Sequence, residues 1–200
     1  MKSFLVATAL SLAAAGALAA TVGQPAPAFT AIDTSGKTVS LADFKGKHVV
    51  LEWVNPGCPY VRRHYDSANM QGTQKDAQAK GAVWLTINST AQDAGDYMQP
   101  AALQQWMTSQ KAAATHTLMD AEGKVGRAYG ARTTPHMYVI NPAGTLVYAG
   151  AIDDQPRASL ADTAKATNHV KAALAESTAG KPVTLATTRA YGCSIKYSSM

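Results

Sequence analysis

The feature that most restricts the fold is a pair of apolar segments separated by one polar, helix-forming segment. Residues 48–54 (HVVLEWV) form a nearly continuous apolar run, and residues 82–88 (AVWLTIN) form a second one. Such runs are typical of strands that are covered on both faces. Between them, residues 59–80 carry polar side chains at helical spacing and end at Gly81. The three segments predict a βαβ unit.

Shorter segments on either side extend this unit into one α/β domain. The turn at residues 34–37 separates two alternating segments and predicts an N-terminal hairpin, and the turn at residues 141–144 predicts a second hairpin. The other expected elements are helices over residues 100–114 and 159–177, one or two helical turns over 123–129, a short extended segment over 117–120, and strands over 134–140 and 145–150. We expect a central mixed sheet flanked by helices, with a C-terminal tail.

The N-terminus has the pattern of a secretory signal peptide. Lys2 gives a positive start, residues 4–20 are apolar or small, and Ala17-Leu18-Ala19 fits the small-x-small rule for cleavage near Ala19 or Ala20. An uncleaved anchor is the alternative. We therefore expect a signal peptide over residues 1–20, a domain over residues 21–178, a tail over residues 179–200, and a mature protein that is periplasmic or secreted.

Net charge and later hydropathy narrow the range of partners. The formal net charge is only +5, and the signal peptide carries one of the charges that produce it. The basic residues are scattered, with Arg62-Arg63 as an adjacent pair. This distribution does not indicate nucleic-acid binding. No segment after the signal is long and apolar enough to cross a membrane, so no membrane partner is expected after cleavage.

Cys58 lies where the first apolar run changes into the expected helix, in the stretch WVNPGCPYVRRHY. A cysteine at this place is a nucleophile, a metal ligand or half of a disulfide. The unpaired amides at a helix N-terminus create a positive potential, which lowers the pKa of a thiol there. Pro59 suits the first helical position. Arg62, one turn further on, either adds positive charge or belongs to a solvated face.

Only one other cysteine, Cys193, is present. Thiols tend to oxidise outside the cytosol, so an exported chain with two distant cysteines is expected to pair them. The pair is either a permanent disulfide or one that cycles between oxidised and reduced forms. A permanent bridge over so long a separation would stabilise the fold by roughly 5 kcal/mol in the chain-entropy model.

Several motifs in this order resemble the thioredoxin-fold redoxins, the group that includes alkyl hydroperoxide reductase/thiol-specific antioxidant proteins. The chain is most similar to the peroxiredoxin-like branch with a single cysteine in the active-site turn, and the resemblance covers roughly residues 22–177. The motifs are VGQPAPAF at residues 22–29, Cys58 in its turn, Thr134-Pro135 before YVINPAG at residues 138–144, and YGCSIKY at residues 191–197.

The resemblance implies roles for both cysteines. Thioredoxins carry a second cysteine three positions after the first, where this chain has Val61. Cys193 is then the natural resolving thiol, which attacks a mixed disulfide or a sulfenic acid on Cys58.

The resemblance also implies roles for residues 134–136. Pro135 is similar to the cis-proline that packs against the reactive cysteine, and the backbone of Thr134 would pair with an extended substrate. A trans edge-strand proline is the alternative. His136 would act as a neighbouring base that tunes Cys58, or it lies on the surface of its strand.

One departure from the family pattern concerns peroxide chemistry. Peroxiredoxins place proline seven residues, and threonine or serine three residues, before the reactive cysteine. Those positions are Leu51 and Asn55 here, and the family arginine would fall at about Pro135. Asn55 could still donate a hydrogen bond, and Arg132 is close in sequence. Disulfide exchange is therefore expected ahead of peroxide reduction.

Two function classes follow. The first is an exported thiol oxidoreductase with catalytic Cys58 and Cys193, an external thiol donor such as a thioredoxin-like protein, and a disulfide or hydroperoxide substrate. The alternative is a non-catalytic module that binds a peptide or copper and has a structural disulfide between the same cysteines. Cys58, His64, His136 and Met137 are residue types that suit copper. No dense ligand motif is present, so no metal or other cofactor is expected.

Overall fold

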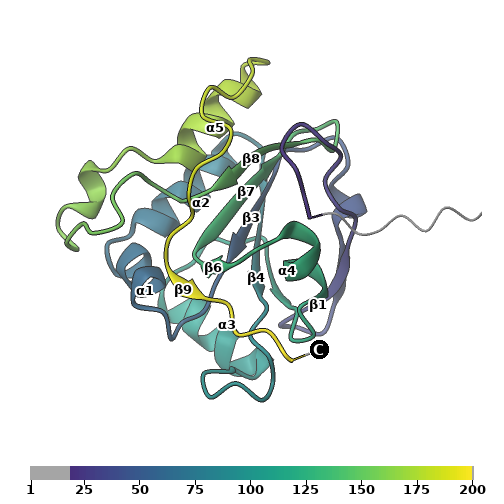
Figure 1. Ribbon diagram of the computed structural model, residues 1–200, viewed down its shortest axis with the longest axis vertical. Helices are drawn as coiled ribbons and strands as arrows, with labels where there is room; N and C mark the ends of the chain where they lie inside the picture. The colour runs from purple at the N-terminus through teal and green to yellow at the C-terminus, as the bar shows by residue number, and fades with distance from the viewer. Residues whose placement is uncertain (1–18, 200) are drawn as a thin grey trace, which may run out of the picture.

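The structure is a computed structural model that describes residues 19–199. The expected signal peptide lies outside the described residues except for Ala19 and Ala20. The core of the fold is a seven-stranded sheet with the order β2-β1-β5-β4-β3-β7-β8 (Figure 1). Its strands are β1 (Thr30–Asp33), β2 (Thr38–Ser40), β3 (Val49–Trp53), β4 (Val83–Asn88), β5 (His116–Met119), β7 (His136–Ile140) and β8 (Leu146–Gly150).

The sheet is mixed, as expected. Strand β4 pairs in parallel with both β3 and β5, whereas β7 pairs antiparallel with β3, and β1 antiparallel with β5. All five residues of β3 are buried, because helices and loops cover both faces of the sheet. The predicted βαβ unit, both hairpins and the thioredoxin-like α/β class are confirmed.

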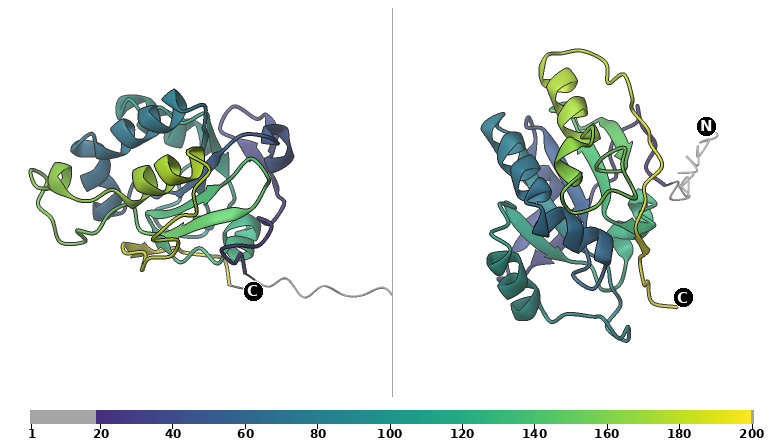
Figure 2. Two further views of the ribbon diagram at one scale, coloured as in Figure 1. Left: turned by 90° about the horizontal axis from the view of Figure 1, so that it is seen from above. Right: turned by 90° about the vertical axis from the view of Figure 1, so that its left-hand side faces the viewer.

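Helices lie on both faces of the sheet, in unequal numbers (Figure 2). Val50 and Val54 of the first apolar run pack with residues of the four longer helices, and Leu51 and Trp53 pack on the other face with α4. The helices are α1 (Pro59–Asp66), α2 (Asn69–Ala79), α3 (Pro100–Ser109), α4 (Lys124–Tyr129) and α5 (His169–Thr178), with short 3-10 helices η1 (Leu41–Phe44) and η2 (Thr163–Lys165).

Three expected helices differ in the structure. The helix over residues 59–80 is two helices, because Ala68 adopts a left-handed conformation (φ 58°) between α1 and α2. Alanine is a strong helix former, so the sequence gave no sign of this break. The helix over residues 100–114 ends at Ser109, before left-handed Lys111. The last helix begins at His169, where the side chain of Asn168 caps it, instead of at residue 159.

The expected strand over residues 134–140 is also divided. Strand β6 (Thr133–Thr134) and β7 are separated by Pro135, and the Thr134–Pro135 peptide bond is cis. Strand β6 leaves the main sheet and pairs antiparallel with β9 (Cys193–Ser194) from the C-terminal tail. The tail therefore crosses the domain and joins it near the end of β3 (Figure 1).

Candidate active site

Cys58 occupies the N-cap of α1, with extended backbone angles (φ −81°, ψ 122°). Its amide donates to the Asn55 carbonyl at 2.9 Å, which closes the turn after β3. Pro59 is the first helical residue, as expected, and its missing N–H leaves no unpaired donor there. The sulfur is therefore placed at the positive end of a helix.

Asn55 holds this turn in shape. Its Oδ1 accepts from the Gly57 amide at 2.7 Å, and its Nδ2 donates to Thr90 Oγ1 at 3.0 Å and to Asp96 Oδ2 at 2.9 Å. The side chain is buried. Because the amide oxygen and both amide hydrogens have partners, the group serves the turn.

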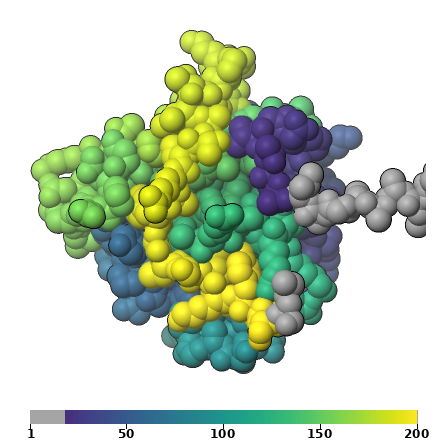
Figure 3. All heavy atoms as spheres, viewed as in Figure 1, coloured from purple at the N-terminus to yellow at the C-terminus, as the bar shows by residue number. Residues whose placement is uncertain are grey.

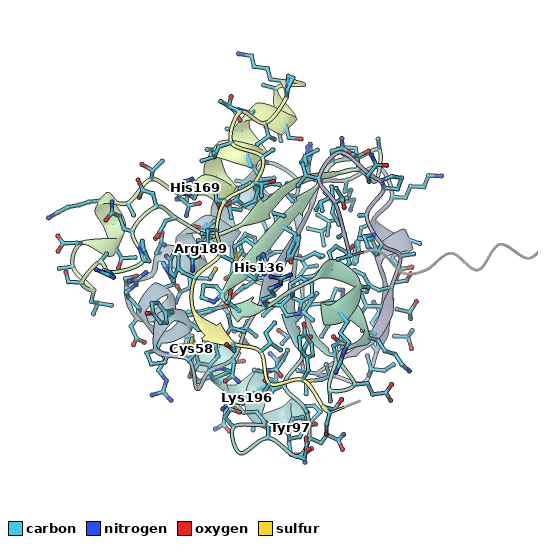
Figure 4. All side chains as sticks on the ribbon, viewed as in Figure 1. Cys58, Tyr97, His136, His169, Arg189 and Lys196 are labelled. Carbon is cyan, nitrogen blue, oxygen red and sulfur yellow. A yellow bond between two sulfur atoms is a disulfide. The ribbon has the colours of Figure 1, made fainter. Side chains whose placement is uncertain are left out.

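Cys58 forms a disulfide with Cys193 across a sequence separation of 135 residues, with 5.8 Å between the Cα atoms. Cys58 is only 2 % exposed, and its Sγ lies 3.0 Å from the carbonyl oxygen of Thr134. In Figure 4, Cys58 lies beside strand β9 of the tail. The tail thus covers the sulfur on the side where α1 begins.

The cis-proline segment is the surface on which the tail is seated. Thr134 is paired with Cys193 in the β6–β9 ladder, and the Ile195 amide donates to the Arg132 carbonyl at 3.0 Å. Gly192 has φ +142°, and a side chain on it would collide with the Thr134 carbonyl oxygen. Glycine at this position allows the tail to approach the cis-proline closely.

Arg62 and His136 have local partners. The Arg62 Nε donates to the Pro56 carbonyl at 2.7 Å, so this exposed side chain braces the turn. The His136 Nδ1 accepts from the Arg132 amide and from Tyr138 Oη, each at 3.3 Å. Burial, with a contribution from the Arg132 charge, lowers the pKa of His136 to about 4, so the ring is neutral at pH 7.

A buried polar cluster beside the disulfide was not foreseen from the sequence. We call Arg63, His64, Asp153 and Tyr191 the tail cluster. Tyr191 Oη donates to Asp153 Oδ1 and lies 3.0 Å from both Arg63 Nη2 and His64 Nε2. Burial, with a contribution from the Arg63 charge, lowers the pKa of His64 to about 3, so its ring is neutral. A neutral ring protonated on Nε2 can donate to Tyr191 while Nδ1 accepts from Asn69 at 2.9 Å.

A second buried carboxyl, Glu52, lies in the middle of β3 and is 0 % exposed. It accepts from Tyr65 Oη at 2.9 Å, Trp84 Nε1 at 2.8 Å, Thr86 Oγ1 at 3.1 Å and Gln74 Nε2 at 3.2 Å. Burial raises its pKa, and the hydrogen bonds oppose that shift. A single charged residue inside the run HVVLEWV was the available sequence signal.

Residues 19–199 contain no group of three or more His, Cys, Asp or Glu side chains arranged to hold a metal ion. His64 belongs to the tail cluster and His136 bonds to Tyr138, so the copper-type residues do not form one ligand set. Within the same residues, no helix is long and apolar enough to span a membrane.

The matches to known proteins agree with this geometry. Residues 22–149 match the AhpC/TSA family, and the chain belongs to that family. Thiol-disulfide oxidoreductase ResA of Bacillus subtilis (strain 168) is 26% identical over 132 residues, which are 62% of this chain and 64% of ResA. The chain therefore spans a little under two thirds of the length of that curated relative.

Two solved structures define the extent of the likeness. A hypothetical protein from Sinorhizobium meliloti 1021 has a TM-score of 0.79 at 25% identity, covering 92% of this chain and 98% of that one. The thioredoxin domain of a thiol-disulfide oxidoreductase from Bacteroides vulgatus has a TM-score of 0.51 at 26% identity, covering 64% and 87%. The redoxin core is thus shared with oxidoreductases, whereas the longer match extends over nearly the whole chain.

Proposed function

We propose that this chain is an exported thiol-disulfide oxidoreductase, with Cys58 as its nucleophile and Cys193 as its resolving thiol. The observation that carries the proposal is the position of Cys58 at the N-terminus of α1, bonded to a cysteine on the strand that pairs with Thr134. A helix N-terminus stabilises a thiolate, so the reduced Cys58 is expected to be the more reactive sulfur.

The reaction proceeds in two exchanges. The Cys58 thiolate attacks one sulfur of a substrate disulfide, forming a mixed disulfide and releasing the other sulfur as a thiolate. The Cys193 thiolate then attacks the Cys58 sulfur, forming the internal disulfide and releasing the second substrate thiolate. Two electrons pass to the substrate, and an external dithiol donor of the thioredoxin type restores both thiols.

Disulfides are preferred to hydroperoxides as substrates in this proposal. The polar atoms of Asn55 are engaged by Gly57, Thr90 and Asp96, and Pro135 stands where a peroxide-orienting arginine would be expected. ResA and the Bacteroides vulgatus protein are both thiol-disulfide oxidoreductases, which supports the same preference.

The proposal includes the processing and location of the chain. Residues 1–20 are a signal peptide, residues 21–178 form the redoxin domain, and residues 179–200 form the tail. The mature protein works in the periplasm or outside the cell, where its disulfide is compatible with the surroundings. No membrane or nucleic-acid partner and no cofactor take part.

Reduction potential and thiol acidity test the proposal against a purely structural disulfide. A catalytic pair is expected to have a potential above about −300 mV and a Cys58 pKa clearly below about 8.5 in the reduced protein. Cys193→Ser is expected to trap a mixed disulfide with a small disulfide substrate, seen as an added mass on Cys58. A potential far below this limit together with an unshifted thiol pKa would favour the binding module with a fixed bridge.

Peroxide reduction is tested separately. Purified Cys58→Ser protein and the parent are compared for hydrogen peroxide consumption in the presence of a dithiol. Equal rates would remove peroxide as a substrate of Cys58, and the disulfide assay would be unaffected by that result.

A further inference from the structure

The tail cluster lies two residues away from Cys193 along the tail. Its His64 is 0 % exposed and its Asp153 is 1 % exposed, so Tyr191 closes over polar groups that are otherwise removed from water. The contacts of its hydroxyl with Asp153, His64 and Arg63 join the tail to α1 and to the loop after β8. This junction does not involve the disulfide.

Asp153 depends on the tail for much of its pairing. Its Oδ1 accepts from Tyr191 and from the Gln155 amide at 3.0 Å, whereas its Oδ2 is buried without a hydrogen-bond partner. A buried carboxylate is costly unless donors satisfy it. Loss of Tyr191 would leave Asp153 with one backbone donor, so the cluster favours the docked tail.

Beyond Cys193 the tail is held mainly through backbone groups. The Ile195 amide bonds to Arg132, the Ala91 amide bonds to the Lys196 carbonyl at 2.8 Å, and Tyr197 Oη donates to the Ala131 carbonyl at 2.8 Å. The space-filling view shows the tail as a continuous band across this face (Figure 3). Tyr197 therefore provides a matched hydroxyl on the same tail, outside the tail cluster.

We propose that Tyr191 is a positioning residue that keeps Cys193 over Cys58 after the disulfide has been reduced. The inference rests on the proposed function, because a permanent disulfide would leave Tyr191 nothing to hold. With the tail docked, Cys193 is present at a high effective concentration and closes the disulfide rapidly. The docked tail also occupies the edge of β6, so a partner strand must displace it to reach Thr134 and Cys58.

Alkylation of Cys58 in a Cys193→Ser background tests the inference directly. Iodoacetamide is the probe, and its rate of reaction reports how often the tail leaves the sulfur. We expect slow alkylation in Cys193→Ser alone and about tenfold faster alkylation when Tyr191→Phe is added, the factor that corresponds to ~1.4 kcal/mol. Tyr197→Phe is expected to change the rate less than twofold.

Gly192→Ala in the same background supplies the reference for a displaced tail, since its side chain would collide with the Thr134 carbonyl. The inference is overturned if Tyr191→Phe alkylates like its parent, or if Tyr197→Phe accelerates the reaction as much. Alkylation requires no turnover. A chain with this pattern but no exchange with disulfides would retain the positioning role and contradict the proposed function.

The reduction potential of the chain with both cysteines provides a second readout. Because a tenfold lower effective concentration corresponds to about 30 mV for a two-electron couple, Tyr191→Phe should raise the potential by about that amount. Tyr197→Phe should leave it within about 10 mV. Equal potentials for the parent and Tyr191→Phe would overturn the inference even if a variant in the serine background failed to fold.

Discussion

The two buried carboxyl groups beside the active-site turn are held in different ways. Glu52 has four side-chain donors, all from strands and helices of the redoxin domain. Asp153 has one side-chain donor, Tyr191, and that residue belongs to the tail. The first arrangement is complete whatever the redox state of the cysteines, whereas the second is complete only while the tail is docked.

This difference separates a stabilising network from a contact that is suited to be broken. A fully satisfied buried network rigidifies its surroundings, and an incompletely satisfied one is costly to retain. Asp153 Oδ2 already lacks a hydrogen-bond partner. We therefore expect substitutions at Glu52 to act on the whole domain, and substitutions around Asp153 to act chiefly on the tail.

The largest effect is expected from Glu52→Ala. Removing the carboxylate leaves four buried donors unpaired and creates a cavity, so the free energy of unfolding should fall by about 4 kcal/mol. Urea unfolding measures the change. Glu122→Ala, at an exposed pair with Lys124, is the control and should leave the midpoint unchanged. A loss below about 1 kcal/mol at Glu52 would contradict a stabilising role for this network.

The two carboxyl environments should also differ in pH dependence through His64. Its pKa falls from 6.5 when unfolded to about 3 when folded, so its contribution is present above pH 6.5 and is lost as the pH falls. For Glu52 the pKa is raised, so its contribution has the opposite sign and is lost as the pH rises through the folded pKa. Between pH 7.5 and 5, His64 alone should account for a loss of about 2 kcal/mol.

Unfolding of His64→Gln at both pH values checks this expectation. The variant should show an acid-induced loss smaller by about that amount than the loss in the parent. His169→Gln, on α5 and outside the tail cluster, keeps the histidine count equal and should retain the parental slope. If the two variants lost stability equally on acidification, protonation of His64 would not be coupled to unfolding.

A smaller, local effect is expected from Asp153→Asn. The amide can still accept from Tyr191, but a neutral acceptor forms a weaker hydrogen bond, and about 1 kcal/mol should be lost. In reduced protein, tail amides such as that of Ile195 should exchange with solvent roughly fivefold faster. Amides of β3 should be unaffected. Uniformly faster exchange throughout the domain would instead place Asp153 with Glu52 as part of the stabilising core.

Much of this site was predictable from the sequence. The βαβ unit and the position of Cys58 follow from local patterns of apolar and turn residues, and the pairing with Cys193 and the cis bond before Pro135 followed from export and from the family resemblance. These features are confirmed because each depends on residue types at fixed places in the chain.

The tail cluster could not be predicted in the same way. Tyr191 and Asp153 are 38 residues apart, and Tyr191 and His64 are 127 apart, so no local spacing relates them. The break at Ala68 was hidden for the opposite reason, since a residue with high helix propensity occupies it. Tertiary packing decides both features.

The smallest expected effect concerns Lys196, whose Nζ lies 2.7 Å from Asp96 Oδ2. Asp96 also accepts from Asn55, so this ion pair joins the tail to the turn that carries Cys58. The Lys196 side chain is 55 % exposed, and an exposed pair is screened by water and salt. Lys196→Ala should therefore weaken tail docking by no more than about 0.5 kcal/mol.

Alkylation of Cys58 in the Cys193→Ser background, measured at low and high salt, tests the contribution of Lys196. At low salt, Lys196→Ala should react less than about threefold faster than its parent, and at about 1 M salt the two rates should converge, because screening then acts within about 3 Å. Tyr191→Phe should keep its larger acceleration at both salt concentrations, since its partners are buried. A salt-dependent Tyr191→Phe or a salt-independent Lys196→Ala would remove the distinction between the buried contact and the exposed one.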